Sequence, residues 1–185
     1  MIRRKSRGLR MSSRPDISQR INELFRSRHW DQARRIIRKE LSRRPLDHWL
    51  LSRLSTTYYE QHKYKRALQF ATKALKLNPR CPLVLWDYAG ALDMTGEKRK
   101  ALAIFKRLVR KGPKRIASEQ CGEGLERARS LVNDSRYSIG LIYGDLGNRR
   151  EASRWLRQSL THVSRGTPSL YSKAAIRHQI ALVSK

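Results

Sequence analysis

The chain repeats itself at an interval of 34 residues. The interval is carried by two residue types that recur together: Pro45, Pro79 and Pro113, and Ala33, Ala67 and Ala101. A proline cannot continue a helix and moves the residue before it away from helical geometry. Units of this length cannot bury their apolar faces alone, so at least three must stack. The interval therefore predicts an array of short, proline-terminated units.

Each unit carries the pattern of two amphipathic helices with a tight turn between them. In the third unit, apolar residues lie at i, i+3, i+4 and i+7, which is one face of a helix: Leu85, Tyr88, Ala89 and Leu92. Gly96 ends this helix, and a second apolar face follows at Ala101, Ile104, Phe105 and Leu108. We assign contiguous units to 14–47, 48–81 and 82–115, an insertion to 116–132, and a fourth unit to 133–166.

Small residues predict where the paired helices approach each other closely. We expect Ala89 to face Ala101 in the third unit and Gly140 to face Ala152 in the fourth. Larger side chains would fill the space between neighbouring pairs.

These residues resemble the tetratricopeptide repeat (TPR), whose pattern combines Leu, a small residue and Tyr, then Ala, Phe and Pro. The matching residues are Leu51, Leu54, Ser55, Tyr58, Ala67, Ala71 and Pro79, then Leu85, Tyr88, Ala89, Leu92, Ala101, Phe105 and Pro113. The sequence departs from the family pattern at Ile17, Leu51, Leu85 and Arg136 in place of Trp, at Arg20 in place of Leu, and at Ser164 in place of Pro. Pentatricopeptide repeats fit less well because their period is longer. The resemblance implies an all-α, right-handed α-solenoid of four helix pairs.

Three segments lie outside the repeats. Residues 1–13 form a basic arm, for which we expect disorder, with an organelle transit peptide as the alternative. The insertion 116–132 predicts a short loop and then a helix that lengthens the first helix of the fourth unit. Residues 167–185 predict the capping helix that a solenoid needs, with Ser169 as its N-cap.

Charge is the extreme feature of the composition. The chain has 42 Lys and Arg against 15 Asp and Glu, a formal charge of +27. The first-helix windows of the four units hold five basic and seven acidic residues, whereas the second-helix windows hold 27 and five. Such a balance suggests an anionic partner such as RNA or a ribosome. The alternatives are a solvated surface and first helices simply depleted of long charged side chains.

The resemblance implies that second helices form the convex back of the solenoid. The residues predicted to form an anion- or nucleic-acid-binding surface there, together with the arm, are Arg3, Arg4, Lys5, Arg35, Arg38, Lys39, Lys73, Lys76, Lys106, Arg107, Arg110, Lys111, Arg154 and Arg157. Contacts to phosphate would be largely independent of sequence and strongly dependent on salt.

The resemblance also implies that first helices line a concave groove that binds a partner peptide or protein. The predicted groove residues are Ser18, Asn22, Trp49, Ser52, Thr56, Tyr59, Trp86 and Asp93. Aromatic residues are enriched at binding hot spots, so Trp49, Tyr59 and Trp86 are candidate anchors; the alternative is that they pack between repeats. No lysine lies in a first-helix window, so we predict no clamp for a C-terminal carboxylate.

No motif for catalysis, a cofactor or a metal is present in the sequence. Cys81 and Cys121 form no CxxC and have no metal-ligand spacing with the histidines, so we expect reduced thiols. No apolar run is long enough for a membrane span. We therefore predict a non-enzymatic, cytoplasmic protein-interaction scaffold; an RNA- or ribosome-associated factor is the alternative.

Overall fold

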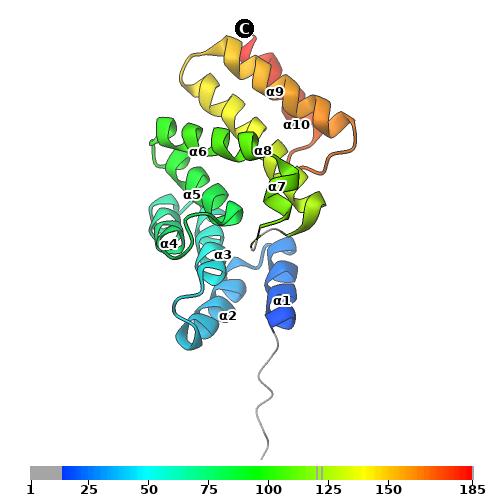
Figure 1. Ribbon diagram of the computed structural model, residues 1–185. Helices are drawn as coiled ribbons and strands as arrows, with labels where there is room; N and C mark the ends of the chain where they lie inside the picture. The colour runs from blue at the N-terminus through cyan, green and yellow to red at the C-terminus, as the bar shows by residue number, and fades with distance from the viewer. Residues whose placement is uncertain (1–13, 120, 122, 185) are drawn as a thin grey trace, which may run out of the picture.

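The computed structural model describes residues 14–119, 121 and 123–184, and helices are the regular secondary structure of these residues. They stack into a curved array from α1 at one end to α9 and α10 at the other (Figure 1). The helices are α1 (Arg14–Arg26), α2 (Trp30–Arg43), α3 (His48–Tyr59), α4 (Tyr64–Leu77), α5 (Pro82–Met94), α6 (Lys98–Lys111), α7 (Pro113–Ala117), α8 (Gly124–Asp145), α9 (Arg149–Ser164) and α10 (Lys173–Val183).

Consecutive helices pack as pairs, α1 with α2, α3 with α4, α5 with α6 and α8 with α9, and α10 covers the last pair. First helices of neighbouring pairs also contact each other, α3 with α5 and α5 with α8. This arrangement confirms the predicted all-α solenoid of four helix pairs with a terminal helix. In no described part of the chain is a helix both long and apolar enough to span a bilayer. The predicted arm 1–13 lies outside the described residues.

The turn inside each pair uses the same backbone conformation at the same repeat position. Gly96 and Gly147 have φ of 92° and 76°, and Arg28 and His62 have φ of 56° and 58°. Positive φ is natural for glycine and costs other residues on the order of 1 kcal/mol. The turn geometry is therefore common to all four pairs, although only two of them carry the favoured residue.

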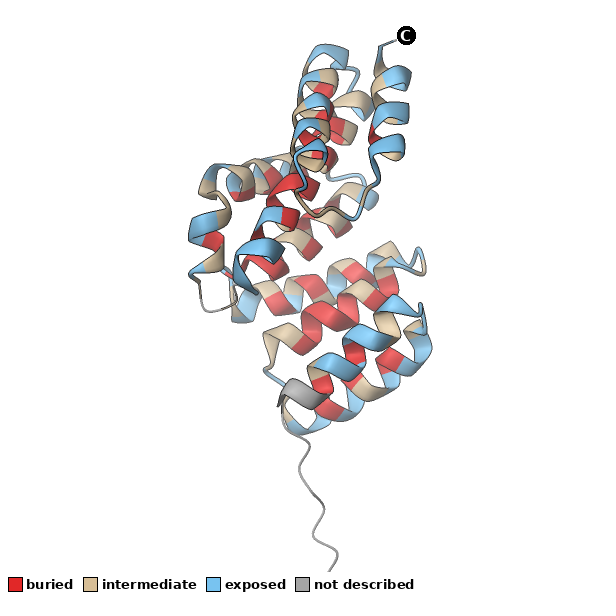
Figure 2. Ribbon diagram, turned by 90° about the vertical axis from the view of Figure 1, so that its right-hand side faces the viewer, coloured by how far each residue is buried: buried red, intermediate tan, exposed pale blue. Residues whose placement is uncertain are grey.

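The interhelical contacts depend on the small residues that recur through the repeats. Ala33, Ala67, Ala101 and Ala152 are all fully buried, and buried positions lie on the facing sides of the helices (Figure 2). The expected contact of Gly140 with Ala152 is wrong. A Cβ added at Gly140 would lie 2.7 Å from Leu156 Cγ, whereas Ala152 Cβ lies opposite Gly144.

The insertion differs in part from the prediction. The sequence predicts a loop where the insertion starts, but Ile116 and Ala117 complete the short helix α7. This helix begins at Pro113, a position where proline is favoured because its missing N–H needs no partner. The lengthened first helix of the fourth pair is confirmed, since α8 begins at Gly124 and has 22 residues.

The prediction of Ser169 as the N-cap of the last helix is wrong. Ser172 is the N-cap of α10, and its side chain accepts a hydrogen bond from Ala175 N at 3.1 Å. Ser169 instead donates to Asp134 Oδ1 at 2.5 Å. It therefore fastens the segment between α9 and α10 to α8.

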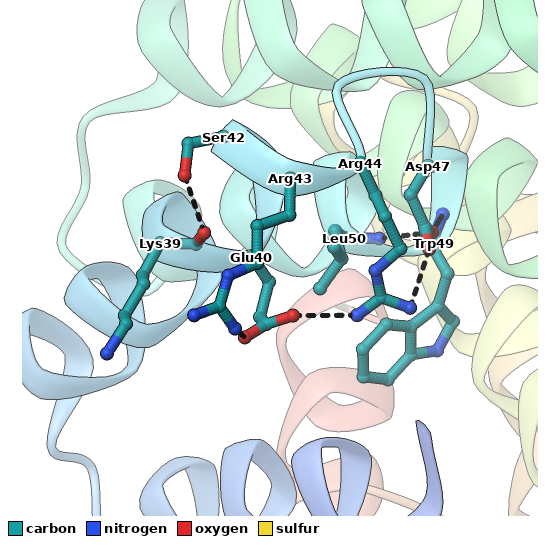
Figure 3. Close-up of polar contacts among 8 residues, drawn as sticks. All are labelled: Lys39, Glu40, Ser42, Arg43, Arg44, Asp47, Trp49 and Leu50. Atoms are coloured by element: carbon teal, nitrogen blue, oxygen red, sulfur yellow. Dashed lines mark hydrogen bonds and ion pairs between the residues drawn. The ribbon is translucent and has the colours of Figure 1, made fainter. Parts of the chain in front are cut away.

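The junction between the first two pairs is held by charged side chains (Figure 3). Glu40 accepts hydrogen bonds from Arg43 and Arg44, at 3.3 and 3.0 Å, and Arg44 also lies 3.7 Å from Asp47. Asp47 Oδ1 accepts from the backbone N–H groups of Trp49 and Leu50, at 3.0 and 3.1 Å. These bonds cap the N-terminus of α3 and so fix the position of its first residue, His48.

Candidate functional site

A cavity of about 680 Å³ lies on the inner side of the curved array. Its walls come mainly from the first helices of the four pairs, α1, α3, α5 and α8, because these helices face the inside of the curve (Figure 1). The lining residues are Asn22, Phe25, Arg26, Arg28, Trp30, Arg53, Thr56, Glu60, Leu83, Trp86, Asp87, Glu123, Arg127, Ser130, Leu131, Asp134 and Leu170.

Arg53 and Asp87 form a buried pair in this lining. They occupy the same repeat position in α3 and α5, 34 residues apart, and Arg53 Nη2 lies 3.7 Å from Asp87 Oδ2. Asp87 Oδ2 also accepts hydrogen bonds from Ser52 Oγ and, at 3.3 Å, from Thr56 Oγ1. Burial raises the pKa of Asp87, and the charge of Arg53 opposes that rise. The pair therefore ties the second repeat to the third.

Asp134 is a second buried carboxylate, at the α8 side of the cavity. It accepts hydrogen bonds from Ser130 Oγ at 3.2 Å, from Ser169 Oγ and from the backbone N–H of Leu170 at 3.3 Å. Burial raises its pKa, and these donors oppose the rise because they favour the ionised form. The carboxylate thus holds the segment around Leu170 against the cavity wall.

Two buried donor atoms in the lining have no acceptor among the described residues: Arg53 Nε and Trp86 Nε1. The Arg53 side chain is only 8% exposed. A buried N–H without an acceptor costs on the order of 1–3 kcal/mol, and an acceptor brought by a ligand removes that cost. Both atoms are inaccessible to solvent, so the Arg53 and Trp86 side chains must shift before a bound polar group can accept hydrogen bonds from them.

The charges of the cavity lining are balanced. Four arginines and four carboxylates contribute to its lining, and Phe25, Trp30 and Trp86 add aromatic surface. Such a mixture suits a ligand with both polar backbone groups and apolar side chains.

Three of the eight predicted groove residues line the cavity: Asn22, Thr56 and Trp86. The other five lie elsewhere or form its support. Ser52 is buried beneath the lining and donates to Asp87.

The remaining predicted groove residues have structural neighbours. Trp49 packs against two core clusters and under Arg53, whose Cζ lies 5.8 Å from the ring centroid. Tyr59 stacks edge-on with Tyr64 at 5.4 Å. Asp93 accepts from Lys98 Nζ at 3.1 Å, and Ser18 is half-buried on α1.

Most residues of the predicted basic surface are exposed, although some of these also have partners: Arg38 donates to Tyr58 Oη at 2.6 Å, and Arg154 forms an ion pair with Glu151 at 3.3 Å. The exposed members within the described chain are Arg35, Arg38, Lys39, Lys73, Lys76, Arg107, Arg110, Arg154 and Arg157. Lys106 is half-buried and donates to Tyr143 Oη at 2.5 Å, and Lys111 forms an ion pair with Glu119. Arg3, Arg4 and Lys5 lie outside the described residues.

Asp87 and Asp134, which the sequence offers with Asp93 and Asp145 as polar groups of the groove, both line the cavity. Arg53 and Arg127 of the inner face were missed from the sequence. Arg53 carried a signal, because it lies one repeat before Asp87 and has the opposite charge. Arg127 carried none, because it lies in the insertion. Cys81 and Cys121 are free thiols, as expected. Although the sequence shows no metal-ligand spacing, the ligand atoms of His48, Cys81 and Cys121 all lie within 4.8 Å of one another.

Comparison with known proteins agrees with this architecture. Two family models, each described as tetratricopeptide repeat, match residues 58–118 and 134–161. No curated protein matches the sequence.

Solved structures with a similar fold include three repeat proteins of low sequence identity. The MamA protein is 17% identical over 90% of this chain and 78% of its own, with a TM-score of 0.60. The apo form of RapI is 19% identical over 91% of this chain, with a TM-score of 0.64, and this chain spans 61% of its length. TTC0263, a thermophilic TPR protein of Thermus thermophilus, is 15% identical over 93% of this chain and 99% of its own, with a TM-score of 0.52. Identities this low establish a shared fold.

Proposed function

The chain belongs to the tetratricopeptide-repeat family, and we propose on that premise that it is a non-enzymatic protein-interaction scaffold whose concave cavity binds an extended segment of a partner protein. The observation that carries the proposal is the pair of buried donors, Arg53 Nε and Trp86 Nε1, in the cavity lining. Backbone carbonyls of an extended peptide supply acceptors for both. The aromatic lining would receive apolar side chains of the same segment.

The balanced charge of the lining supports a peptide with mixed character over a polyanion. Arg26, Arg28 and Arg127 are exposed at this face, but Glu60 and Glu123 are exposed beside them. A polyanion would meet the carboxylates as well as the arginines and gain little. A peptide with separate acidic and basic side chains can pair with both.

The proposal is tested by selecting peptides from a displayed random library on the full chain and measuring their affinities by fluorescence anisotropy. Trp86→Phe removes the N–H donor and keeps an aromatic ring, so we expect peptide affinity to fall about 3- to 10-fold, the value of one hydrogen bond. The free protein should lose only the packing of the larger ring against the core cluster, because the lost donor has no acceptor there.

Trp155→Phe is the matched control. Trp155 Nε1 donates to Glu151 Oε2 at 3.1 Å, and the residue lies on α9 outside the cavity lining. We expect this variant to bind peptide as the wild type does. Equal effects of the two substitutions, or selected peptides that bind unchanged to Trp86→Phe and Arg53→Met, would contradict a role for the cavity.

A second candidate function rests on the exposed lysines and arginines of the second helices. Nine of the predicted basic residues are exposed on α2, α4, α6 and α9. These residues support the alternative of an RNA- or ribosome-associated factor that binds phosphate through its convex face. The logarithm of the observed binding constant for single-stranded RNA should then fall linearly with the logarithm of the salt concentration, with a slope of about −0.7 per phosphate contact. A slope near zero would remove this candidate and leave peptide binding intact.

A further inference from the structure

Three side chains with metal-ligating atoms meet at the outer end of the second and third repeats. His48 is the first residue of α3, Cys81 directly precedes α5, and Cys121 lies in the connection between α7 and α8. Their ligand atoms all lie within 4.8 Å of one another, and His48 Nε2 lies 3.1 Å from Cys121 Sγ. The three residues come from separate elements, so their convergence follows from the tertiary fold.

The spacing of these atoms is close to that of a zinc site. Zinc binds thiolate sulfur at about 2.3 Å and imidazole nitrogen at about 2.0 Å in a tetrahedral arrangement, which places two bound sulfurs about 3.8 Å apart. The present spacing therefore needs side-chain shifts of about 1 Å or less to close around an ion. Thiolate and imidazole together select soft or borderline metals over magnesium and calcium.

The surroundings hold these side chains in place. The N-terminus of α3, where His48 lies, is capped by Asp47 (Figure 3). The backbone N–H of Cys81 donates to Asn78 Oδ1 at 3.1 Å, and Asn78 Nδ2 lies 3.5 Å from Cys121 Sγ and 3.4 Å from His48 Nε2. Asn78 thus contacts all three residues. Its N–H groups can continue to donate to Cys121 Sγ in a metal complex, whereas the contact with His48 Nε2 is replaced by the metal, because that nitrogen has a single lone pair.

The two cysteines differ in exposure in a way that suits metal entry. Cys81 is 3% exposed and packs in a core cluster with Leu51, Leu83 and Val84, whereas Cys121 packs on the outside of this cluster and is half-buried. An ion can therefore arrive from the Cys121 side and reach the interior sulfur. Cys81 is also the N-cap of α5. Burial raises the pKa of its thiol to about 12, and the backbone N–H groups of Val84 and Leu83 oppose that rise.

We propose that His48, Cys81 and Cys121 form a zinc-binding site, with water at the fourth coordination position. On binding, the two S–H bonds break, two zinc–sulfur bonds form, and the two protons pass to solvent; no group is oxidised or reduced. His48 binds as the neutral imidazole through Nε2. The site joins the start of the second repeat, the start of the third and the insertion, across 73 residues between His48 and Cys121.

Such a crosslink has a defined structural consequence. Cys121 lies two residues before Glu123, and the cavity is lined by Glu123 on one side and by Leu83, two residues after Cys81, on the other. Zinc would therefore fix the insertion to the repeats at the edge of the cavity. The proposal does not depend on what the cavity binds.

The test uses the untagged full chain, reduced and freed of metal by a chelator that is then removed. Co²⁺ is the spectroscopic probe, and Zn²⁺ is titrated against a chromophoric competitor. We expect one Co²⁺ per chain with a thiolate-to-cobalt charge-transfer band and intense tetrahedral d–d bands, both lost on adding Zn²⁺. Zinc should raise the Tm and release two protons per ion into a weakly buffered solution.

Variants separate the proposed ligands from other residues. Cys121→Ser removes a half-buried ligand with little effect on folding, and it should weaken zinc binding by more than about 100-fold, beyond the loss caused by removing a supporting group. His48→Gln should weaken binding and shift the d–d bands but keep the charge-transfer band. His178→Gln, an exposed residue of α10, is the control and should bind as the wild type does.

Three results would overturn the proposal. One is a fully reduced chain that gives no charge-transfer band with Co²⁺. Another is a Cys121→Ser variant whose zinc affinity stays within twofold of the wild type. The third is a protein isolated with Cys81 and Cys121 joined as a disulfide that takes up no metal after reduction.

Discussion

The third and fourth helix pairs use different residues at the same repeat positions. Three corresponding positions hold Ala89, Ala101 and Phe105 in α5–α6, and Gly140, Ala152 and Leu156 in α8–α9. In the third pair, both alanines are fully buried in one core cluster. In the fourth, Gly140 lets Leu156 come nearer than any Cβ would allow. The repeat thus specifies that two helices pack closely, and the residue at each position specifies how closely.

The buried carboxylates of the two pairs are held by partners on opposite sides in the sequence, before Asp87 and after Asp134. Asp87 of α5 is held by Ser52, Arg53 and Thr56 of the preceding repeat. Asp134 of α8 is held by Ser169 and Leu170, which follow α9. The third pair is therefore fastened to the regular repeats, and the fourth to the segment that leads into the terminal helix.

The largest expected effect comes from overpacking the third pair. Ala101 is fully buried within the core cluster that contains Ala89 and Phe105. Ala101→Trp should lower the free energy of unfolding by about 3 kcal/mol or more, because the added ring forces the two helices apart. Urea denaturation followed by circular dichroism measures the change. Ala103→Trp, on the exposed face of α6, is the control and should change stability by less than about 0.5 kcal/mol. If Ala101→Trp were as stable as the wild type, the assigned repeat register would be wrong.

A smaller effect distinguishes the fourth pair from the third. Gly140→Ala places a Cβ 2.7 Å from Leu156 Cγ and 3.2 Å from its backbone nitrogen, so it should destabilise the protein by about 1–3 kcal/mol, despite the better helix propensity of alanine. Gly90→Ala is the matched substitution in α5, where the nearest atom is in the Tyr59 ring at 3.6 Å. That variant should gain up to about 1 kcal/mol. Equal midpoints for the two variants would show that α8 and α9 do not approach as closely as described.

The smallest effect tests how Asp134 fastens the fourth pair. Ser169→Ala removes a hydrogen bond to the carboxylate and should cost about 1–2 kcal/mol at neutral pH. Burial raises the pKa of Asp134 in the folded protein above the pKa of the same carboxyl in the unfolded chain. The folded state therefore holds this proton to higher pH, and the stability contributed by the protonated carboxyl is lost as pH rises through the folded pKa. Because Ser169 favours the ionised form, the cost of Ser169→Ala should be least below about pH 4 and grow above the folded pKa.

Ser172→Ala provides the comparison for this pH dependence. Ser172 caps α10 through a backbone N–H, so its loss should cost about 1 kcal/mol at every pH. The difference between the two variants in urea midpoints, measured across the acidic range, is the observable. Parallel profiles would contradict the role assigned to Ser169.

Much of the fold was predictable because its contacts are local or one repeat apart. Buried alanines, the turns at Gly96 and Gly147, and the packing of first against second helices follow from a period that the chain displays several times. The inner face was predictable in its helices but less in its residues. Trp86 and Thr56 line the cavity, but Arg53 replaces the expected Trp49, because that indole packs between core clusters instead.

The errors over Ser169 and over the start of the insertion lie where one segment meets another that the repeat does not describe. The sequence context of Ser169 suits an N-cap, but the helix begins three residues later, after Ser172. Asp134, brought near by the packing of α9 on α8, decided between them. The meeting of Cys121 with His48 and Cys81 likewise depends on how the insertion folds, because no spacing in the sequence indicates a shared site.

The sequence by itself determined the family, the number of helix pairs and the basic character of the second helices, because each is written in a pattern that recurs every 34 residues. The tertiary structure alone decided the cavity, its two buried donors and the meeting of two cysteines with a histidine. Periodicity specifies which faces are apolar and where helices end. Contacts between segments of unrelated sequence depend on the curvature of the whole array, which accumulates from small differences in packing such as that between Ala89 and Gly140.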